Sequence, residues 1–350
     1  MHDYNWFKGD KIKVGIYGES HSESIGVRLE GLMYSSLDED KLRAFMRRRA
    51  PGNNAWSTPR KEADEVIIDK LENGVFEAHI LNTNIRPADY SDLLRTPRPS
   101  HADFTAGLKY GPDFKSSGGG AFSGRLTAPL CIAGFLALSH LAQKGIRISS
   151  RIKEIGGIKD ASLDLDKLRE VRNKEFPVIN DQKGEEMKKA IEEARLSEDS
   201  VGGIIETVIE GLPGGIGGPI FEGIEGKIAQ ICFAIPAVKG IEFGNGFEAA
   251  RLKGSDNNDS LVYEDGKLKL ETNRCGGILG GISVGGDVAP VIFDCAVKPT
   301  PTIGKEQRTV DLLTGENTTL KAKGRHDPCI VPRAVPVFEA AAALAIADLI

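Results

Sequence analysis

Three of the chain's six histidines stand in polar, turn-rich segments where an imidazole can exchange a proton with a ligand. They are His21 in GESHSES, His101 in RPSHAD and His326 in GRHDPC, each with an arginine or a carboxylate close by. The other three stand apart and are more typical of structural or surface histidines. Because no HExxH or other metal-ligand spacing occurs, the three favour acid–base chemistry over zinc binding.

Cationic side chains suited to an anionic ligand fall in three other segments. Arg47, Arg48 and Arg49 end a predicted helix beside APGNN, where they either complement the helix dipole or hold an anion. Arg125 follows the glycine-rich SGGGAFSGR, where a helix should begin and backbone N–H groups can approach an oxyanion. This run is neither a Walker loop nor a dinucleotide fingerprint. Lys298 precedes PTPT, so residue types and spacing indicate an acid–base enzyme for a polyanion.

Composition limits the class of protein. The chain has 350 residues, 40% of them hydrophobic, 41 glycines and a formal net charge of −5. This balance excludes a nucleic-acid binder that relies on bulk positive charge. No signal-peptide core is visible, and the longest apolar runs are expected to be broken before they reach membrane-spanning length, so a cytoplasmic protein is predicted. Five cysteines without CxxC spacing favour reduced, buried thiols: Cys131, Cys232, Cys275, Cys295 and Cys329.

The first third of the chain predicts mostly strands. Residues 11–18 and 26–32 should form a hairpin whose connection carries His21, and residues 65–80 should form two strands joined at Asn73-Gly74. Between them, a helix through residue 49 is expected, with Ser36 as its N-cap.

The remaining chain alternates helices and strands. A long buried helix is predicted after the glycine run, a closing helix over 332–350, an amphipathic surface helix over 184–200, and strands over 201–213 and 288–300. Residues 273–286 are too glycine-dense for regular structure to be expected. Since no linker or repeat is evident, the prediction is one domain over residues 1–350.

Taken together, these segments resemble the chorismate synthase family. GESHS at 18–22 is similar to the family's GESHG, RPSHAD at 98–103 to RPGHAD, and residues 48–64 to RRAPG…STPRKEAD. GGGAFSGRLTAPL, AVKGIEFGNGF, GGILGGIS, KPTPT and GRHDPC…PRAVP continue the match in order to the C-terminus. The resemblance thus spans nearly the whole chain.

The resemblance implies a fold, an activity and partners. The fold is α+β, a single-domain β-α-β sandwich with long helices between antiparallel sheets, in a homotetramer. The activity is a 1,4-elimination that converts 5-enolpyruvylshikimate 3-phosphate to chorismate and phosphate with reduced FMN. NADPH is implied only as an indirect reductant, an external flavin reductase is expected because no dinucleotide fingerprint occurs, and neither nucleic acid nor membrane is an expected partner.

Matching positions imply the roles of individual residues. His21 would protonate the departing phosphate, and His101 would act at the N1 region of the flavin. Ser20 and Asp327 would help to relay a proton through flavin N5. The implied FMN-binding residues are Ser123, Ala237, Gly280, Lys298, Pro299, Thr300, Pro301, Thr302 and Arg325. The implied substrate-binding residues are Arg48, Arg49, Arg125 and Arg325.

The chain departs from the family pattern inside these same motifs. Ser22 and Ser100 replace glycines, which costs on the order of 1 kcal/mol wherever the backbone needs a positive φ. Ala121 replaces a histidine or arginine, and the TTGTP-like turn after GVF is absent. Two alternatives therefore stay open: a flavin-binding homologue with another phosphorylated substrate, and a relative with poor catalytic activity.

Overall fold

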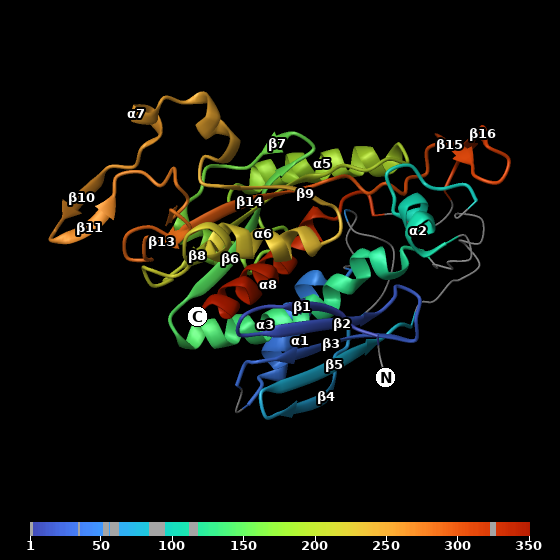
Figure 1. The fold of residues 1–350 in the computed structure, drawn as a ribbon. Helices are drawn as coiled ribbons and strands as arrows, with labels where there is room; N and C mark the ends of the chain where they lie inside the picture. The colour runs from blue at the N-terminus through green and yellow to red at the C-terminus, as the bar shows by residue number, and fades with distance from the viewer. Residues whose placement is uncertain are drawn as a thin grey trace.

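Two five-stranded antiparallel sheets enclose a layer of helices, as Figure 1 shows. The computed structural model describes residues 3–33, 36–51, 56, 63–83, 95–111, 118–322 and 327–350. The predicted β-α-β sandwich is therefore confirmed, and with it the α+β class.

The first sheet has the strand order β1-β2-β3-β5-β4. Its strands are β1 Asn5–Lys8, β2 Lys13–Gly18, β3 Ser24–Glu30, β4 Ile67–Glu72 and β5 Val75–Leu81. Alternate residues such as Val14, Val27 and Ala78 are buried against the helices, as expected of a sheet with one solvated face. The predicted hairpins are confirmed: β2 pairs with β3, and Asn73 and Gly74 turn with φ of 51° and 71°.

The second sheet has the order β7-β6-β8-β14-β9. Its strands are β6 Arg147–Ile155, β7 Ile158–Lys159, β8 Gly203–Glu210, β9 Val238–Phe243 and β14 Val291–Val297. β8 and β14 are the strands predicted over 201–213 and 288–300. The first residues after β14 form the KPTPT segment, so this sheet delivers Lys298 to the site.

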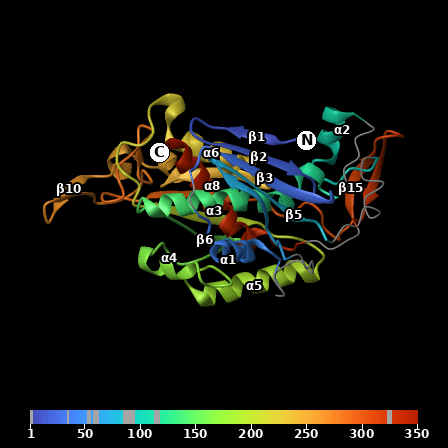
Figure 2. The same ribbon diagram turned by 90° about the horizontal axis from the view of Figure 1, so that it is seen from below.

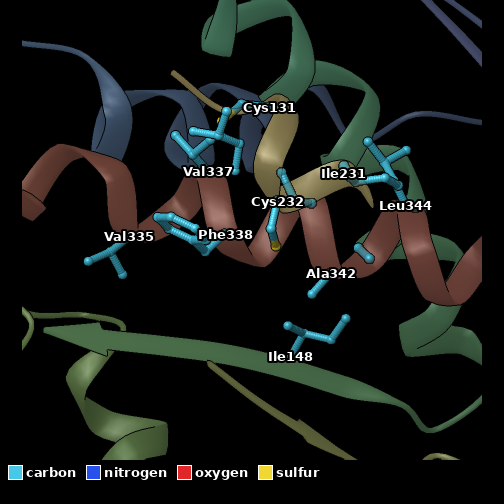
Figure 3. Close-up of a cluster of buried hydrophobic side chains, with 14 of the residues drawn as sticks. Cys131, Ile148, Ile231, Cys232, Val335, Val337, Phe338, Ala342 and Leu344 are labelled. Carbon is cyan, nitrogen blue, oxygen red and sulfur yellow. The ribbon is translucent and has the colours of Figure 1, made fainter. Parts of the chain in front are cut away.

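Helices α1 Glu39–Arg49, α3 Thr127–Gln143, α6 Ile224–Ala234 and α8 Val331–Leu349 fill the space between the sheets. Figure 3 shows side chains of α8, among them Val337 and Phe338, meeting Cys131, Cys232 and Ile148 in this core. Where α3 crosses α8, a Cβ on Gly134 would lie 2.1 Å from the Cβ of Ala340. Small residues therefore let the two central helices approach closely, and the buried residues of both sheets and the helices form one continuous core.

Smaller elements extend the sandwich at both ends. α4 Leu165–Val171 and α5 Asp181–Leu196 pack on the outer side of the second sheet. The hairpin of β10 Leu261–Glu264 and β11 Lys267–Leu270 lies at one end of the molecule. At the opposite end, Figure 2 places α2 Asp103–Tyr110 near the hairpin of β15 Gln307–Asp311 and β16 Glu316–Leu320.

Three local expectations were wrong. The N-cap of α1 is Asp38, whose carboxylate accepts a 3.0 Å hydrogen bond from Lys41 N, and not Ser36. The glycine-dense 273–286 contains a minimal hairpin, β12 Ile278–Leu279 and β13 Ile282–Ser283, because Gly280 and Gly281 supply φ of 61° and 83°. The stretch Gly124–Gln143 is long and apolar enough to cross a membrane, but 67% of its 18-residue apolar window is buried within the protein, as expected of a core helix.

The cysteine prediction agrees with the structure. All five cysteines are free thiols, four of them buried and Cys275 half-buried.

Candidate active site

A cavity of about 590 Å³ opens where loops from both sheets meet the ends of the central helices. Its volume is within the ~300–1,000 Å³ typical of small-molecule and cofactor sites. Arg49 of α1 and six segments contribute lining residues, namely 20–21, 98–102, 118–127, 233–239, 298–302 and 327–337. All six segments overlap motifs that the sequence analysis singled out.

His21 reaches the cavity from the connection between β2 and β3. A Cβ on Gly118 would lie 2.7 Å from His21 Nε2, so only glycine lets the backbone pass this imidazole so closely. Ser20 N donates to Gly120 O at 3.2 Å and joins the two segments. The His21 loop and the glycine-rich run are therefore packed against each other and joined by a backbone hydrogen bond.

Ser22 and Ser100, the two serines that replace glycines, behave differently. Ser22 is absent from the described residues with positive φ, and its hydroxyl lies 2.8 Å from Glu19 N and 2.7 Å from Ser24 O, which braces the turn. Ser100 has φ of +58°, a conformation that costs a non-glycine residue on the order of 1 kcal/mol. The strain expected of these substitutions is present only at Ser100.

His101 belongs to a buried cluster with Arg98 and Asp103. Its Nδ1 lies 2.7 Å from Asp103 Oδ1. Arg98 holds the same carboxylate with two hydrogen bonds, Nε to Oδ2 and Nη2 to Oδ1, both 2.7 Å long. Burial alone would raise the pKa of Asp103, but the hydrogen bonds from Arg98 and His101 hold that pKa far below its ordinary value. Asp103 is therefore an ionised carboxylate beneath the imidazole.

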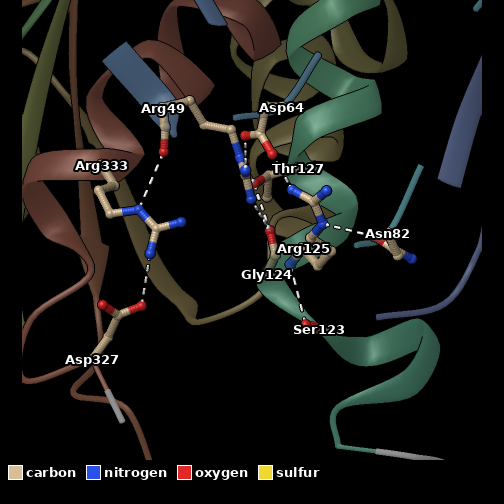
Figure 4. Close-up of polar contacts among 9 residues, drawn as sticks. All are labelled: Arg49, Asp64, Asn82, Ser123, Gly124, Arg125, Thr127, Asp327 and Arg333. Atoms are coloured by element: carbon tan, nitrogen blue, oxygen red, sulfur yellow. Dashed lines mark hydrogen bonds and ion pairs between the residues drawn. The ribbon is translucent and has the colours of Figure 1, made fainter. Parts of the chain in front are cut away.

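Arg49 and Arg125 share one buried carboxylate, as Figure 4 shows. Each guanidinium forms an ion pair with Asp64, whose side chain is fully buried. Arg125 Nε also donates to Asn82 Oδ1 at 3.1 Å, and Arg49 Nε donates to Thr127 Oγ1 at 3.2 Å. The two guanidinium groups place cationic hydrogen-bond donors at this wall of the cavity, which favours an anionic ligand.

The pKa of Asp64 follows from this arrangement. Burial would raise it, but the charges of Arg49 and Arg125 lower it below the ordinary value, so the carboxylate is ionised. Asp64 also has φ of +48°, a conformation that short polar residues tolerate better than others.

Asp327 faces the cavity from the segment that precedes α8. Its Oδ2 accepts a 2.8 Å hydrogen bond from Arg333, and Arg333 Nε donates to Arg49 O at 3.2 Å. Its Oδ1 is buried and finds no hydrogen-bond partner within the described part of the chain. A buried carboxylate oxygen in this state is costly unless a ligand donates to it.

The KPTPT segment closes another wall. Lys298 Nζ donates to Ser100 O at 2.7 Å, and Lys298 N donates to O of Ala237, which has φ of +75°. Burial, and to a lesser degree the charge of Lys239, lowers the pKa of Lys298. Both lysines line the cavity and give it a second cationic region.

Most of the residues predicted from the sequence come together here. Those that line the cavity are Ser20, His21, Arg49, His101, Ser123, Arg125, Ala237, Lys298, Thr300, Pro301, Thr302 and Asp327. Pro299 is not among the lining residues, and Gly280 is in the β12–β13 turn instead. Arg48 is bound to the fully buried Glu339 through two hydrogen bonds of 2.6 and 2.8 Å. Arg325 and His326 lie outside the described residues.

Sequence reasoning assigned no role to several residues that line the cavity or contact its lining residues. Arg98 and Asp103 flank His101 at a spacing that could have indicated a cluster. Asp64 and Asn82 carried no such signal, because they are 61 and 43 residues from the Arg125 that they contact. Arg333 was hidden in what looked like an ordinary closing helix.

The lining of the cavity suits an anionic, hydrogen-bonding cofactor. Its lining offers hydroxyls, lysines and the buried Asp327 Oδ1, which needs a donor. The described residues include no group of three His, Cys, Asp or Glu side chains that could hold a metal ion. Such a donor set suits a phosphate and a heterocycle with N–H groups, as in a flavin mononucleotide.

Fold and cavity together define an α+β enzyme for a small anionic ligand. The family model described as chorismate synthase matches residues 12–350, and the chain belongs to the chorismate synthase family. The resemblance noted in the sequence is thereby confirmed.

Similar proteins agree over the full length. The chain is 42% identical to the chorismate synthase of Lancefieldella parvula, covering 97% of this chain and 94% of that protein. It is 43% identical to the chorismate synthase of Lachnoclostridium phytofermentans, covering 98% and 94%. A solved structure titled "Crystal Structure of Chorismate Synthase" matches with a TM-score of 0.73 at 27% identity, covering 98% of this chain and 92% of that one.

Proposed function

We propose that this cavity is the active site of a carbon–oxygen lyase that converts 5-enolpyruvylshikimate 3-phosphate to chorismate and phosphate. Membership of the chorismate synthase family over residues 12–350 is the observation that carries this conclusion. Many relatives at about 40% identity bear the same name, so a homologue with another substrate or with poor activity is not favoured.

The substrate's phosphate and carboxylates would bind the cationic walls. Arg49 and Arg125 are held rigidly by Asp64, which supports their assignment because a fixed guanidinium loses little entropy on binding an anion. Arg48 and Arg325 complete the assigned set. The pairing of Arg48 with Glu339 means that Arg48 would act on the substrate only by exchanging that partner.

Four residues are assigned to proton transfer. His21 would donate a proton to the departing phosphate, and the glycine backbone at Gly118 holds its ring at the cavity wall. His101 would hold a proton at the flavin N1 region. Asp327, with Ser20, would receive the proton removed from the substrate, and the buried Oδ1 of Asp327 is the atom suited to accept it.

Reduced FMN is the cofactor that the family implies and that the cavity lining fits. When bound, it supplies electron density to the elimination and recovers it afterwards, so no net oxidation occurs. The residues assigned to hold it are Ser123, Ala237, Gly280, Lys298, Pro299, Thr300, Pro301, Thr302 and Arg325. Lys298 offers the positive charge for its phosphate, and Thr302 offers a hydroxyl.

The domain organisation, the oligomeric state and the source of reduced flavin are also proposed. One continuous hydrophobic core supports a single domain over residues 1–350. A cytoplasmic homotetramer would take its reduced flavin from an external reductase, with NADPH acting only through that reductase. Anaerobic turnover of the substrate by protein supplied with chemically reduced FMN tests the function.

A further inference from the structure

His101 Nδ1 has two close polar neighbours, and only one of them can be its hydrogen-bond partner. Asp103 Oδ1 lies 2.7 Å away and Arg98 Nη2 lies 3.0 Å away. An ionised carboxylate only accepts hydrogen bonds and a guanidinium only donates them. The choice between these neighbours therefore decides which ring nitrogen carries the proton.

Counting hydrogens resolves the choice. Arg98 Nη2 has two hydrogens. Two acceptors, Asp103 Oδ1 and Gly118 O, lie 2.7 Å from it and are therefore closer than His101 Nδ1 at 3.0 Å. With both hydrogens engaged, Nη2 has none left for the imidazole. Nδ1 must then be the donor, and Asp103 Oδ1 its acceptor.

We propose that Asp103 is a positioning residue that fixes His101 with its proton on Nδ1, so that Nε2 is the ring atom that gains and loses the proton facing the cavity. The assignment of that proton to the reaction rests on the proposed function. Nothing in the resemblance or the comparisons assigns a role to Asp103. The arrangement parallels the aspartate of a hydrolase triad, which sets the tautomer of its histidine.

The same cluster fixes the position of the ring. Arg98 Nη1 donates to Thr302 Oγ1 at 3.3 Å, so one guanidinium joins the His101 loop, the glycine-rich run and the KPTPT segment. The side chains of Arg98 and Asp103 are only 4% and 9% exposed, and burial keeps this geometry from exchanging with water.

Substitution by asparagine should reverse the tautomer. Oδ2 of Asp103 accepts from N and Nε of Arg98, at 3.0 and 2.7 Å, and both of these groups only donate. Oδ1 also has two donors, Arg98 Nη2 and His101 Nδ1, but the imidazole nitrogen can become an acceptor. An amide oxygen is needed at that position to receive two donors, which places the amide NH2 against His101 Nδ1. Nδ1 must then accept, and the ring proton moves to Nε2.

Magic-angle-spinning 15N spectra of histidine-labelled protein test the proposal directly. As pH is raised, Nε2 of His101 should lose its proton first while Nδ1 keeps its own, and His101→Gln identifies the signals. In Asp103→Asn, the neutral ring should carry the proton on Nε2. Loss of the proton from Nδ1 in the unsubstituted protein would overturn the proposal, whether or not the variant folds.

A matched control separates this role from the general cost of losing an ion pair. Asp311 is held by Arg95 through Nε at 2.8 Å and Nη2 at 2.6 Å, but it does not touch His101. Asp311→Asn should leave the His101 signals unchanged. If it shifts them as much as Asp103→Asn does, the spectra report only a general disturbance of the neighbouring loops, and the assignment is overturned.

The spectra need neither flavin nor substrate. If the protein makes no chorismate but Nδ1 keeps its proton, the proposed function fails and the tautomer assignment stands. If chorismate is made, Asp103→Asn should lower kcat by about 10²-fold or more with little change in KM, because the ring then presents a donor where an exchangeable acceptor is needed. Unchanged kcat would overturn the link to the reaction.

Discussion

The guanidinium of Arg125 lies against the fully buried carboxylate of Asp64, although the two residues are 61 positions apart. The same carboxylate holds Arg49, so one anion contacts two cationic side chains of the cavity. This shared contact makes Asp64 the residue whose loss should affect both stability and substrate binding.

Asp64→Asn should lower the free energy of unfolding by ~3–5 kcal/mol, because it removes the buried charge that two buried guanidinium groups share. Substrate affinity should fall as well, since both arginines lose their fixed position. Urea unfolding and calorimetry measure the two effects. The control is Asp40→Asn in the exposed pair with Arg43, where the change should stay below about 1 kcal/mol. Equal effects at the two sites would refute this role for Asp64.

The sign of the pH dependence follows from the lowered pKa of Asp64. Its folded pKa lies below the unfolded value, so its contribution to stability is present above the unfolded pKa and is lost as pH falls through the folded one. Acid unfolding of the unsubstituted protein should therefore contain a component that Asp64→Asn lacks. If the unfolding free energy of the two proteins falls identically as pH is lowered, this prediction is contradicted.

Asp294 should show the opposite pH dependence. Burial between β8 and β9 raises its pKa to about 6, although Lys153 opposes the shift. A raised folded pKa means that this stabilising contribution is present below the unfolded value and is lost as pH rises through about 6. Unfolding free energies at several pH values should show this loss in the unsubstituted protein and not in Asp294→Asn. If the unfolding free energies of the unsubstituted protein and of Asp294→Asn change in parallel with pH, the raised pKa of Asp294 is contradicted.

His21→Ala and His101→Ala should each reduce turnover by about 10²-fold or more, because each removes a group assigned to hold a proton in the cavity. His140→Ala is the control, since His140 lies on α3 and does not line the cavity. Steady-state assays with reduced FMN measure the effect. Wild-type turnover in both cavity variants would remove these histidines from the mechanism.

Ala121→His should tighten FMN binding. Ala121 lines the cavity beside Phe122 and Ser123, at a position where the resemblance implies a histidine or arginine. An added imidazole can supply a hydrogen bond worth about 1 kcal/mol, roughly a five-fold change in affinity. Ala250→His, on the exposed surface, is the control for fluorescence titration. An unchanged dissociation constant for Ala121→His would dismiss this account of the substitution.

Local pattern was sufficient to predict most elements that position the site. Two strand-like runs joined at Asn73-Gly74 predicted the β4–β5 hairpin, the apolar sequence after the glycine run predicted α3, and the C-terminal segment predicted α8. Two-residue strands such as β12 are too short for any pattern to reveal. The choice of Asp38 over Ser36 as N-cap depends on where the chain leaves β3, which local sequence does not encode.

The site was predictable only where its residues belong to a motif. His21 and His101 are marked by their neighbours in the sequence, and Arg125 by the glycine run before it. The partners of these residues are set by tertiary packing: Asp64 meets Arg49 and Arg125 only because α1 and the start of α3 lie side by side.

The most direct measurement of the central claim is an anaerobic assay that combines the purified protein, dithionite-reduced FMN and 5-enolpyruvylshikimate 3-phosphate. Chorismate absorbance and released phosphate should rise together in equal amounts, and neither should rise with oxidised FMN or without the protein. Bound flavin without product would contradict the proposed activity and would direct attention to Ser100 and Ala121, where this cavity departs from the family pattern.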